Sequence, residues 1–539
     1  MNTAEQLIEF DRIKEQLAEF SCTQKGKQAA MQLKPYLSET EVRTGQRETS
    51  EARAMFEKCG NPPVTALEGI EEWIGAAQRG ECLSPWQLEQ IRAILNAVGR
   101  MKDYLNHCKQ YQISLAYYEE NLDSMEELRL EISEKIRGER VDDFASRLLK
   151  TLREEIDAAD AKMHEKADAA IRANKACMSD SFSTIRSGHL CIPVKKEYKY
   201  KIKGAVIDKS ATGNTMFIEP LAVSKCYEKL QELKIEEENE ERRILYTLSA
   251  MLSDKEELFL KNSRTIEKLD FIFAKARLSL EYDGVEPLFN TLRYIRLKGG
   301  RHPLMDKKTS VPLDFEIGNK INGIVITGPN TGGKTVALKT VMINCMMAQS
   351  GLHVPCEKAE ICMNDAFLCD IGDGQNLSEN LSTFSAHITN VLSILRRADR
   401  ESLVVMDELG SGTDPAEGMG IAIAVLEELK KSGALFLVTT HYPEVKEYTK
   451  KEEHIVNARM TFDKETLRPL YRLVIGEAGE SCAFYIAGKL GMPKDMLRRA
   501  AYEAYGNEPA VDVDRLAEKE RLEKTSHEKI KRKKDISRQ

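Results

Sequence analysis

The first part of the chain repeats apolar side chains at the spacing of an α-helix. One stripe is formed by Leu7, Phe10, Ile13 and Leu17, and a second by Ile91, Leu95 and Val98. Residues three and four apart lie on one face of a helix, so this spacing predicts amphipathic helices that pack on a core. The Gly-Asn-Pro-Pro sequence at 60–63 predicts a break between two helical groups. We interpret residues 1–122 as a helical core.

Two long, highly charged runs follow, at about 123–178 and 221–260. Their apolar residues form only a narrow stripe, which is typical of long helices that either pair as a coiled coil or stand in solvent. Between them, residues 183–220 change to short apolar runs with glycines, a pattern that predicts β-hairpins. For residues 123–285 we therefore expect a lever of two long helices with a β insert at 183–220.

The insert is strongly basic. Its cationic side chains are Arg186, Lys195, Lys196, Lys199, Lys201 and Lys203, and they are interleaved with Tyr198 and Tyr200. Lysine and arginine release counterions from a phosphate backbone, and aromatic rings stack on bases. This composition predicts a nucleic-acid contact. A hairpin face that is merely solvated has the same composition and stays open as the alternative.

From about residue 297 the pattern changes to apolar runs of strand length that alternate with helical segments. The runs lie at 321–327, 366–370, 403–407 and 434–439, and a Gly-rich turn and a helical pattern follow each of the first three. This order predicts a parallel α/β sheet in a domain at 286–507. The charged tail at 508–539 is expected to be helical or disordered.

Composition limits the class of protein. Of 539 residues, 42% are hydrophobic and 31% are charged, which excludes global disorder. The formal charge of −7 means that any nucleic-acid binding needs a local basic patch. There is no membrane-length apolar run and no export signal at the N-terminus, and the twelve cysteines are typical of reduced thiols. We therefore expect a cytoplasmic protein.

A phosphate-binding loop is predicted directly after the apolar run at 321–327. Its residues are Gly328, Pro329, Asn330, Thr331, Gly332, Gly333, Lys334 and Thr335, which fit the pattern G-x-x-x-x-G-K-[ST]. Glycines let backbone N–H groups turn toward phosphates, and the helix that follows adds its positive N-terminus. Lys334 is predicted to reach the β- and γ-phosphate oxygens of ATP, and the Thr335 hydroxyl to hold Mg²⁺.

Two acidic residues lie at the end of the apolar run at 403–407. Asp407 is predicted to support Mg²⁺, and Glu408 to polarise the attacking water as a general base. This division of roles favours hydrolysis over nucleotide binding alone. His441 follows a further apolar run, and we interpret it as a side chain that senses the γ-phosphate.

Four segments together resemble the MutS family of ATPases, which belong to the ABC-type class: 328–335, 381–384, 407–415 and 439–442. Within this family the bacterial type-two branch is the most similar, on segments that include 185–194, 205–220, 271–277 and 301–303. The resemblance extends from about residue 5 to residue 506. It implies a helical core and lever, then a clamp, then an ABC-type P-loop ATPase domain that forms a homodimer.

The resemblance also implies roles for individual residues. Ser382 and Thr383 are expected to face the nucleotide of the partner subunit, and residues 410–414 to lie across the dimer interface. Asn330 is expected to orient the γ-phosphate or the attacking water.

Two departures from the family pattern shape the expected function. The tripeptide Phe217-Ile218-Glu219 is the one Phe-x-Glu motif, and it lies in the insert, so reading of mismatches is not expected. The chain stops at Gln539, within what would be a coiled coil, so no Smr nuclease domain and no intrinsic endonuclease are expected. We predict an ATP-hydrolysing homodimer that clamps branched or recombining DNA. The alternatives are a factor that splits stalled or collided ribosomes and, third, a structural ATPase that links protein partners.

Overall fold

The computed structural model describes residues 4–66, 69–328, 332–371, 383–463, 469–479 and 483–505. The chain forms two compact units. Unit 1 comprises residues 1–21, 25–57 and 271–539, and unit 2 comprises residues 22–24 and 58–270. The division into four domains that the sequence predicts stays a prediction, and its tail at 508–539 lies outside the described residues.

Unit 1 is built on a six-stranded sheet with the order β12-β13-β14-β10-β15-β16. Its strands are β10 (Gly323–Thr327), β12 (Ala366–Asp370), β13 (Ser402–Met406), β14 (Leu435–Thr439), β15 (Ile455–Phe462) and β16 (Pro469–Ile475). The first five strands in this order are parallel, and β16 runs antiparallel to β15. The parallel α/β sheet predicted from the apolar runs is confirmed.

Helices cover both faces of this sheet. They are α11 (Lys334–Gln349), α12 (Thr383–Arg397), α13 (Pro415–Ser432) and α14 (Pro443–Lys451), and α15 (Ala483–Lys489) and α16 (Lys494–Tyr505) follow β16. Successive strand residues point to opposite faces, so Ile324 and Ile326 pack in one core with α11. Val325 packs in a second core with residues of α12, α13 and α14. Burial on both faces explains why these strands are continuous apolar runs.

The rest of unit 1 comprises a small sheet and the N-terminal helices. The small sheet has the order β7-β11-β8-β9, with β7 (Leu288–Asn290), β8 (Tyr294–Gly300), β9 (Leu313–Gly318) and β11 (Lys358–Cys362). The helices are α1 (Ala4–Leu7), α2 (Phe10–Glu19), most of α3 (Gln24–Met31) and of α4 (Glu39–Cys59), and the end of α10 (Glu256–Glu281). Of the predicted stripe, Phe10, Ile13 and Leu17 are fully buried in the core that contains α11, and Leu7 is partly buried against it.

Unit 2 is mainly helical. Its elements before the insert are α5 (Ile70–Gln78), α6 (Pro85–Cys108), the 3₁₀ turns η1 (Lys109–Tyr111) and η2 (Ser114–Asn121), α7 (Glu126–Lys135), β1 (Ile136–Arg137), β2 (Arg140–Val141), α8 (Arg147–Ala173) and η3 (Lys175–Cys177); α9 (Leu221–Ser253) follows the insert. The second predicted stripe is buried here, where Ile91 and Leu95 pack with Leu248 and Leu252 of α9. Within the described residues of either unit, no helix is long and apolar enough to span a bilayer.

The continuous helix predicted over 123–178 is wrong. The chain turns back between α7 and α8 through the two-residue strands β1 and β2, where Gly138 adopts a φ of 66°. A new helix then starts behind Ser146, whose hydroxyl accepts a hydrogen bond from the Leu149 N–H at 3.0 Å. A left-handed glycine followed by an N-cap serine is the physical reason for the break. The second run is also interrupted, since α9 ends at Ser253 and α10 begins at Glu256.

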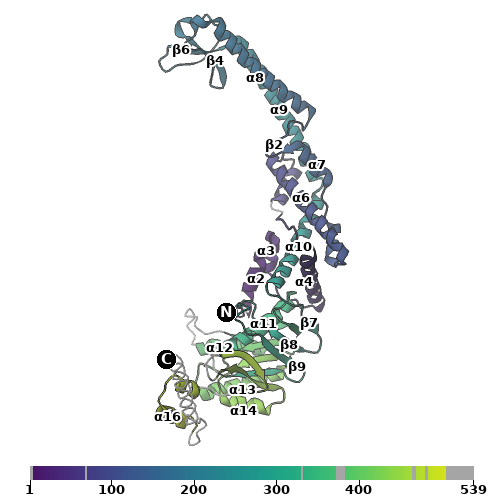
Figure 1. Cartoon of the computed structure of the whole chain (residues 1–539), viewed down its shortest axis with the longest axis vertical. Coiled ribbons are helices and arrows are strands. Elements are labelled where there is room, and N and C mark those ends of the chain that lie inside the picture. Colours follow the sequence, from purple (N-terminus) through teal and green to yellow (C-terminus); the bar gives the residue numbers. More distant parts are fainter. Residues whose placement is uncertain are drawn as a thin grey trace, which may run out of the picture. The chain divides into compact units, whose positions relative to one another are not determined.

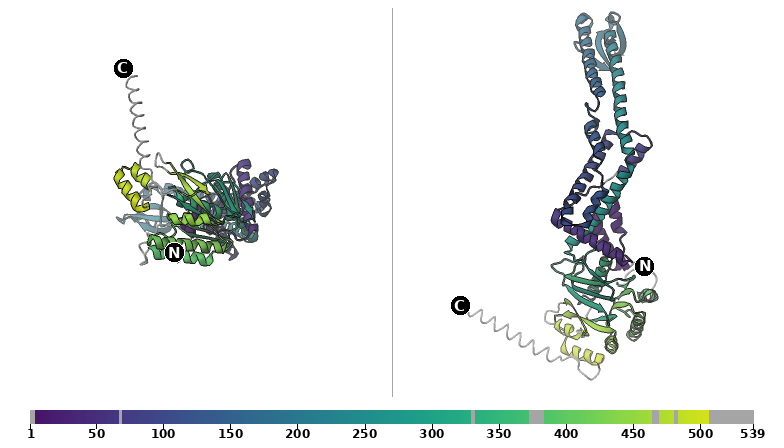
Figure 2. Two further views of the ribbon diagram at one scale, coloured as in Figure 1. Left: turned by 90° about the horizontal axis from the view of Figure 1, so that it is seen from below. Right: turned by 90° about the vertical axis from the view of Figure 1, so that its right-hand side faces the viewer.

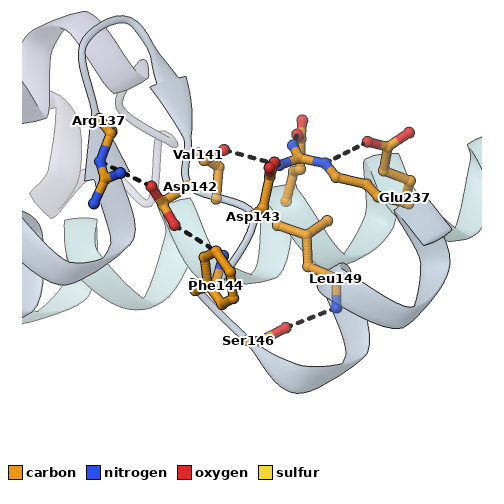
Figure 3. A network of polar contacts seen from close by, with 10 residues as sticks. Arg137, Val141, Asp142, Asp143, Phe144, Ser146, Leu149 and Glu237 are labelled. Carbon is orange, nitrogen blue, oxygen red and sulfur yellow. Dashed lines mark hydrogen bonds and ion pairs between the residues drawn. The ribbon is translucent and has the colours of Figure 1, made fainter.

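Arg153 fixes this turn against α9. Figure 3 shows the polar network around the turn, with the Arg153 partners Val141, Asp143 and Glu237 labelled. Its guanidinium donates to the Glu237 carboxylate at 2.8 Å, to the Glu241 carboxylate at 2.5 Å and to the Val141 carbonyl at 3.1 Å, and it also pairs with Asp143. The arginine therefore joins α8, α9 and the loop that follows β2.

A four-stranded antiparallel sheet lies between α8 and α9 in the chain. Its order is β3-β4-β6-β5, with β3 (Thr184–Arg186), β4 (His189–Lys195), β5 (Gly204–Lys209) and β6 (Thr215–Pro220), and the turn η4 (Lys196–Tyr198) follows β4. Ile192, Val194 and Ile218 pack in one core with Met163 of α8 and Leu230 of α9. The predicted β structure at 183–220 is confirmed, and the two long helices lie side by side (Figures 1 and 2).

Candidate nucleotide site

The predicted phosphate loop lies between β10 and α11. Gly328 directly follows the strand with a φ of 132°, and Gly333 precedes the helix with a φ of 86°. Residues with a Cβ rarely adopt these angles, so the chain needs glycine at both turns. Pro329, Asn330 and Thr331 lie outside the described residues. The described part of the loop has the strand-to-helix setting that a phosphate loop requires.

Lys334 is the buried cation of the site. Its Nζ donates to the Gly328 carbonyl at 2.8 Å and lies 3.4 Å from His441 Nδ1. Burial lowers the pKa of Lys334 to about 8, although the negative charges of Asp407 and Glu408 oppose this effect. A desolvated cation at the start of a helix favours an anionic ligand. The residues therefore fit a phosphate group.

The predicted metal ligands meet across the sheet. Thr335 Oγ1 donates to Asp407 Oδ2 at 2.5 Å, and Thr439 donates to the other carboxylate oxygen of Asp407. Thr439 in turn accepts the Glu408 N–H at 2.7 Å. Because β14 lies between β10 and β13 in the sheet, Thr439 stands between the two halves of the site. Thr335 and Asp407 present adjacent oxygen atoms, the ligand type that Mg²⁺ prefers.

Glu408 and His441 lie on the open side of the site. His441 Nε2 is 3.5 Å from Glu408 Oε1, and each side chain is 41% exposed. Glu408 has a φ of 49°, an unusual backbone angle for a residue with a side chain. Strained backbone of this kind is often found at functional sites. The sequence-predicted residues Lys334, Thr335, Asp407, Glu408 and His441 are thus brought together.

Three polar residues of a neighbouring cluster were missed by the sequence reasoning. Asp370, at the end of β12, accepts hydrogen bonds from His387 Nδ1 at 3.1 Å and from Asn390 Nδ2 at 2.8 Å. The Asp370 carbonyl also accepts the Asp407 N–H at 2.8 Å. The carboxyl ends of parallel strands meet at one edge of a sheet, and this rule was the signal that could have drawn attention to Asp370.

An aromatic side chain also borders the loop. Tyr471 of β16 has a φ of 53°, and its ring lies so close to Gly333 that a Cβ on the glycine would come within 2.5 Å of it. A ring in this position can stack on a nucleotide base. No local motif marks Tyr471 in the sequence.

The residues implied for the partner subunit's site remain predictions. Ser382 lies outside the described residues, as does the side chain of Thr383. In the segment 410–414, Asp414 has a local structural role, because it caps α13 by accepting the Ala416 N–H at 2.9 Å.

The basic residues lie in unit 2, in strands β3 and β4 of the four-stranded sheet and in the segment 196–203 that joins β4 to β5. Arg186 stacks on Phe217 at 4.4 Å, Lys199 lies over Tyr200 at 4.6 Å, and Lys201 lies over Tyr198 at 4.9 Å. Tyr200 is 89% exposed. Lys195, Lys196 and Lys203 are exposed as well, and Lys199 is half-buried. Cationic and aromatic groups are therefore accessible together on this surface.

Comparison with known proteins adds independent findings. Residues 324–505 match the family model described as MutS domain V. A protein named Endonuclease MutS2 from Geobacillus sp. (strain WCH70) is 41% identical over 502 residues, which are 92% of this chain and 64% of that protein. A protein of the same name from Clostridium botulinum (strain 657 / Type Ba4) is 39% identical over 508 residues, and the match covers 93% of this chain and 64% of that protein.

A third relative with the same name, from Halothermothrix orenii, is 38% identical over an aligned stretch of 540 positions that covers 98% of this chain and 68% of the relative. The chain thus spans about two thirds of the length of these relatives, and 64% of the first two. The similarity runs through both units as well as the nucleotide site, and the chain belongs to the MutS family.

Proposed function

We propose that this protein is an ATP-hydrolysing clamp that works as a homodimer and binds branched or recombining DNA. The observation that carries the proposal is the meeting of Lys334, Thr335, Asp407, Glu408 and His441 at one edge of the sheet of unit 1. A buried cation, paired oxygen ligands and an exposed carboxylate are the groups that hydrolysis of a phosphoanhydride requires.

The mechanism assigns one task to each group. Lys334 binds the β- and γ-phosphate oxygens, and charge neutralisation by the phosphates would offset the cost of its burial. Thr335 and Asp407 would hold Mg²⁺, which when bound neutralises charge on the phosphates. Glu408 orients the attacking water and accepts its proton, and His441 donates a hydrogen bond to the γ-phosphate.

The family resemblance supports a dimeric state. Ser382 and Thr383 of one subunit would complete the nucleotide site of the other, and Asn330 would orient the γ-phosphate. ATP can close such a dimer only through its higher affinity for the closed state, typically about 1–3 kcal/mol of coupling. Hydrolysis then removes this preference and reopens the clamp.

The basic surface on and beside the β3-β4-β6-β5 sheet of unit 2 supports nucleic acid as the bound partner. Its lysines can displace counterions from phosphates, and the exposed ring of Tyr200 can stack on an unpaired base. Unpaired and splayed bases occur at branch points, which favours branched DNA over intact duplex.

The test uses Glu408→Gln, which keeps the side-chain shape but removes the base. With ATP and Mg²⁺ we expect a long-lived dimer in light scattering and retention of a four-way DNA junction in preference to duplex. Lys334→Ala is the control and should neither bind ATP nor dimerise with it. A parent protein that stays monomeric when saturated with a non-hydrolysable ATP analogue would contradict the proposal, and so would an unchanged hydrolysis rate of Glu408→Gln.

The same experiment separates the alternatives. Retention of ribosomes in place of the junction would favour the ribosome-splitting function, and retention of neither would favour a structural ATPase. The expectation that the chain has no endonuclease activity stays a prediction. Incubation of supercoiled plasmid with the protein and divalent metal tests it, since nicking converts the plasmid to its relaxed form.

A further inference from the structure

Helix α12 (Thr383–Arg397) is tied to the edge of the sheet through one carboxylate. Both oxygens of Asp370 accept hydrogen bonds from this helix: Oδ2 from His387 Nδ1 at 3.1 Å and Oδ1 from Asn390 Nδ2 at 2.8 Å. His387 and Asn390 are three residues apart, so they lie on the same face of the helix. The Asp370 side chain is 11% exposed, and α12 therefore holds it in a largely buried position.

The main chain of Asp370 extends this link to the predicted catalytic residues. Its carbonyl accepts the Asp407 N–H at 2.8 Å, just beyond the parallel ladder of β12 and β13. This bond fixes the peptide group at which β13 ends and from which Asp407 and Glu408 emerge. A continuous path of hydrogen bonds thus runs from His387 through Asp370 to Asp407, and from Asp407 to Thr335 at the start of α11.

The charges around His387 agree with this arrangement. The hydrogen bond to Asp370 raises the pKa of His387, and the negative charges of Glu408 and Asp407 raise it further, against the effect of burial. The imidazole therefore lies within electrostatic reach of both predicted catalytic carboxylates. A donor that tends to carry positive charge strengthens its hydrogen bond to a carboxylate.

We propose that His387 and Asp370 form a positioning pair that holds the Met406–Asp407 peptide group, and with it the side chains of Asp407 and Glu408, in register for ATP hydrolysis. The proposal rests on the function proposed above and adds two residues to it. Neither is a catalytic residue, because both act through the Met406–Asp407 peptide group, which precedes the Asp407 and Glu408 side chains. Removal of partners that orient a catalytic ligand typically lowers activity about 10–100-fold.

The test compares His387→Ala and His387→Gln with the parent in steady-state ATP hydrolysis. For His387→Ala we expect kcat to fall about 10-fold or more while the KM for ATP changes little. His387→Gln keeps a side-chain N–H donor and should recover part of the loss. Thr389→Ala is the matched control on the same helix, since Thr389 is exposed and, among the residues that the structure describes, its hydroxyl donates locally to the Ser385 carbonyl.

A double-mutant cycle with Asp370→Asn completes the test. If the two residues act as a unit, the double variant His387→Ala/Asp370→Asn should be no slower than the slower single variant. Additive losses would overturn the proposal, as would a kcat of His387→Ala and His387→Gln within about twofold of the parent. A higher KM for ATP with an unchanged kcat would also overturn it. A parent protein without ATPase activity would refute the proposed function. Failure of the proposed function can therefore be told apart from failure of the positioning pair.

Discussion

Because Lys334 is buried, we predict that its positive charge lowers the stability of unit 1. The pKa of this lysine falls from its ordinary 10.5 to about 8 in the folded protein because the ammonium is desolvated. Each pKa unit corresponds to about 1.4 kcal/mol, so the charged lysine costs unit 1 about 3 kcal/mol near neutral pH. Lys334→Met removes the charge at similar length. It also removes the hydrogen bond to the Gly328 carbonyl, worth about 1 kcal/mol. We expect a net stabilisation of about 2 kcal/mol.

The pH dependence of this gain follows from the sign of the pKa change. Between about pH 8 and pH 10.5 the unfolded chain still binds the lysine proton while the folded chain has released it, so the stability of the parent rises with pH. The advantage of Lys334→Met should therefore be largest at neutral pH. At about pH 9 it should be smaller by roughly 1 kcal/mol.

Calorimetry at two pH values is the assay, because the two units are expected to unfold in separate transitions. Trp73 and Trp86 are the two tryptophans of the chain and both lie in unit 2, so their fluorescence monitors that unit as an internal control. The transition of unit 1 should shift upward in Lys334→Met, and the tryptophan signal should not move. A non-hydrolysable ATP analogue should raise the unit 1 transition of the parent only. The reasoning is refuted if the variant is no more stable than the parent, or if its gain is equal at both pH values.

Three further predictions concern other parts of the molecule. Thr439→Val removes a donor to Asp407 and the acceptor of the partly buried Glu408 N–H, so calorimetry should show a loss of about 1–3 kcal/mol in unit 1 and ATPase assays a lower kcat. Unchanged stability and kcat would show that the Thr439 hydroxyl does not support Asp407 and Glu408. The double variant Lys195→Ala/Lys196→Ala should reduce the slope of log K for DNA binding against log [salt] by about 2. Titrations at several salt concentrations measure this slope, and an unchanged slope would exclude phosphate contacts at these two lysines. Arg153→Met should lower the stability of unit 2 by about 1 kcal/mol, a modest value because the carboxylates it pairs with are partly exposed. Urea unfolding followed by tryptophan fluorescence checks this, and an equal midpoint would contradict it.

Much of unit 1 was predictable from local sequence. The strands β10, β12, β13 and β14 are apolar runs because both faces of the sheet are buried, and a continuous run is visible without knowledge of the fold. The turn in unit 2 was harder to predict. Gly138 and Ser146 break the helix between α7 and α8, yet the charged residues around them fit a helix equally well. Two local signals conflicted there, and packing against α9 decided between them.

The sequence by itself determined the chemistry of the nucleotide site. The spacing from Gly328 to Thr335 and the acidic pair Asp407 and Glu408 act through local backbone geometry, namely a turn before a helix and the end of a strand. Such geometry depends on neighbours in the chain, so a motif is enough to reveal it.

Only the tertiary structure decided how these pieces meet. Because β14 lies between β10 and β13, Thr439 bridges Asp407 and the Glu408 N–H, and α12 reaches Asp370 beside them. The lowered pKa of Lys334 likewise arises from burial by residues distant in sequence. Strand order and burial are set by long-range packing, whose free energy is shared among many side chains, so no short segment records them.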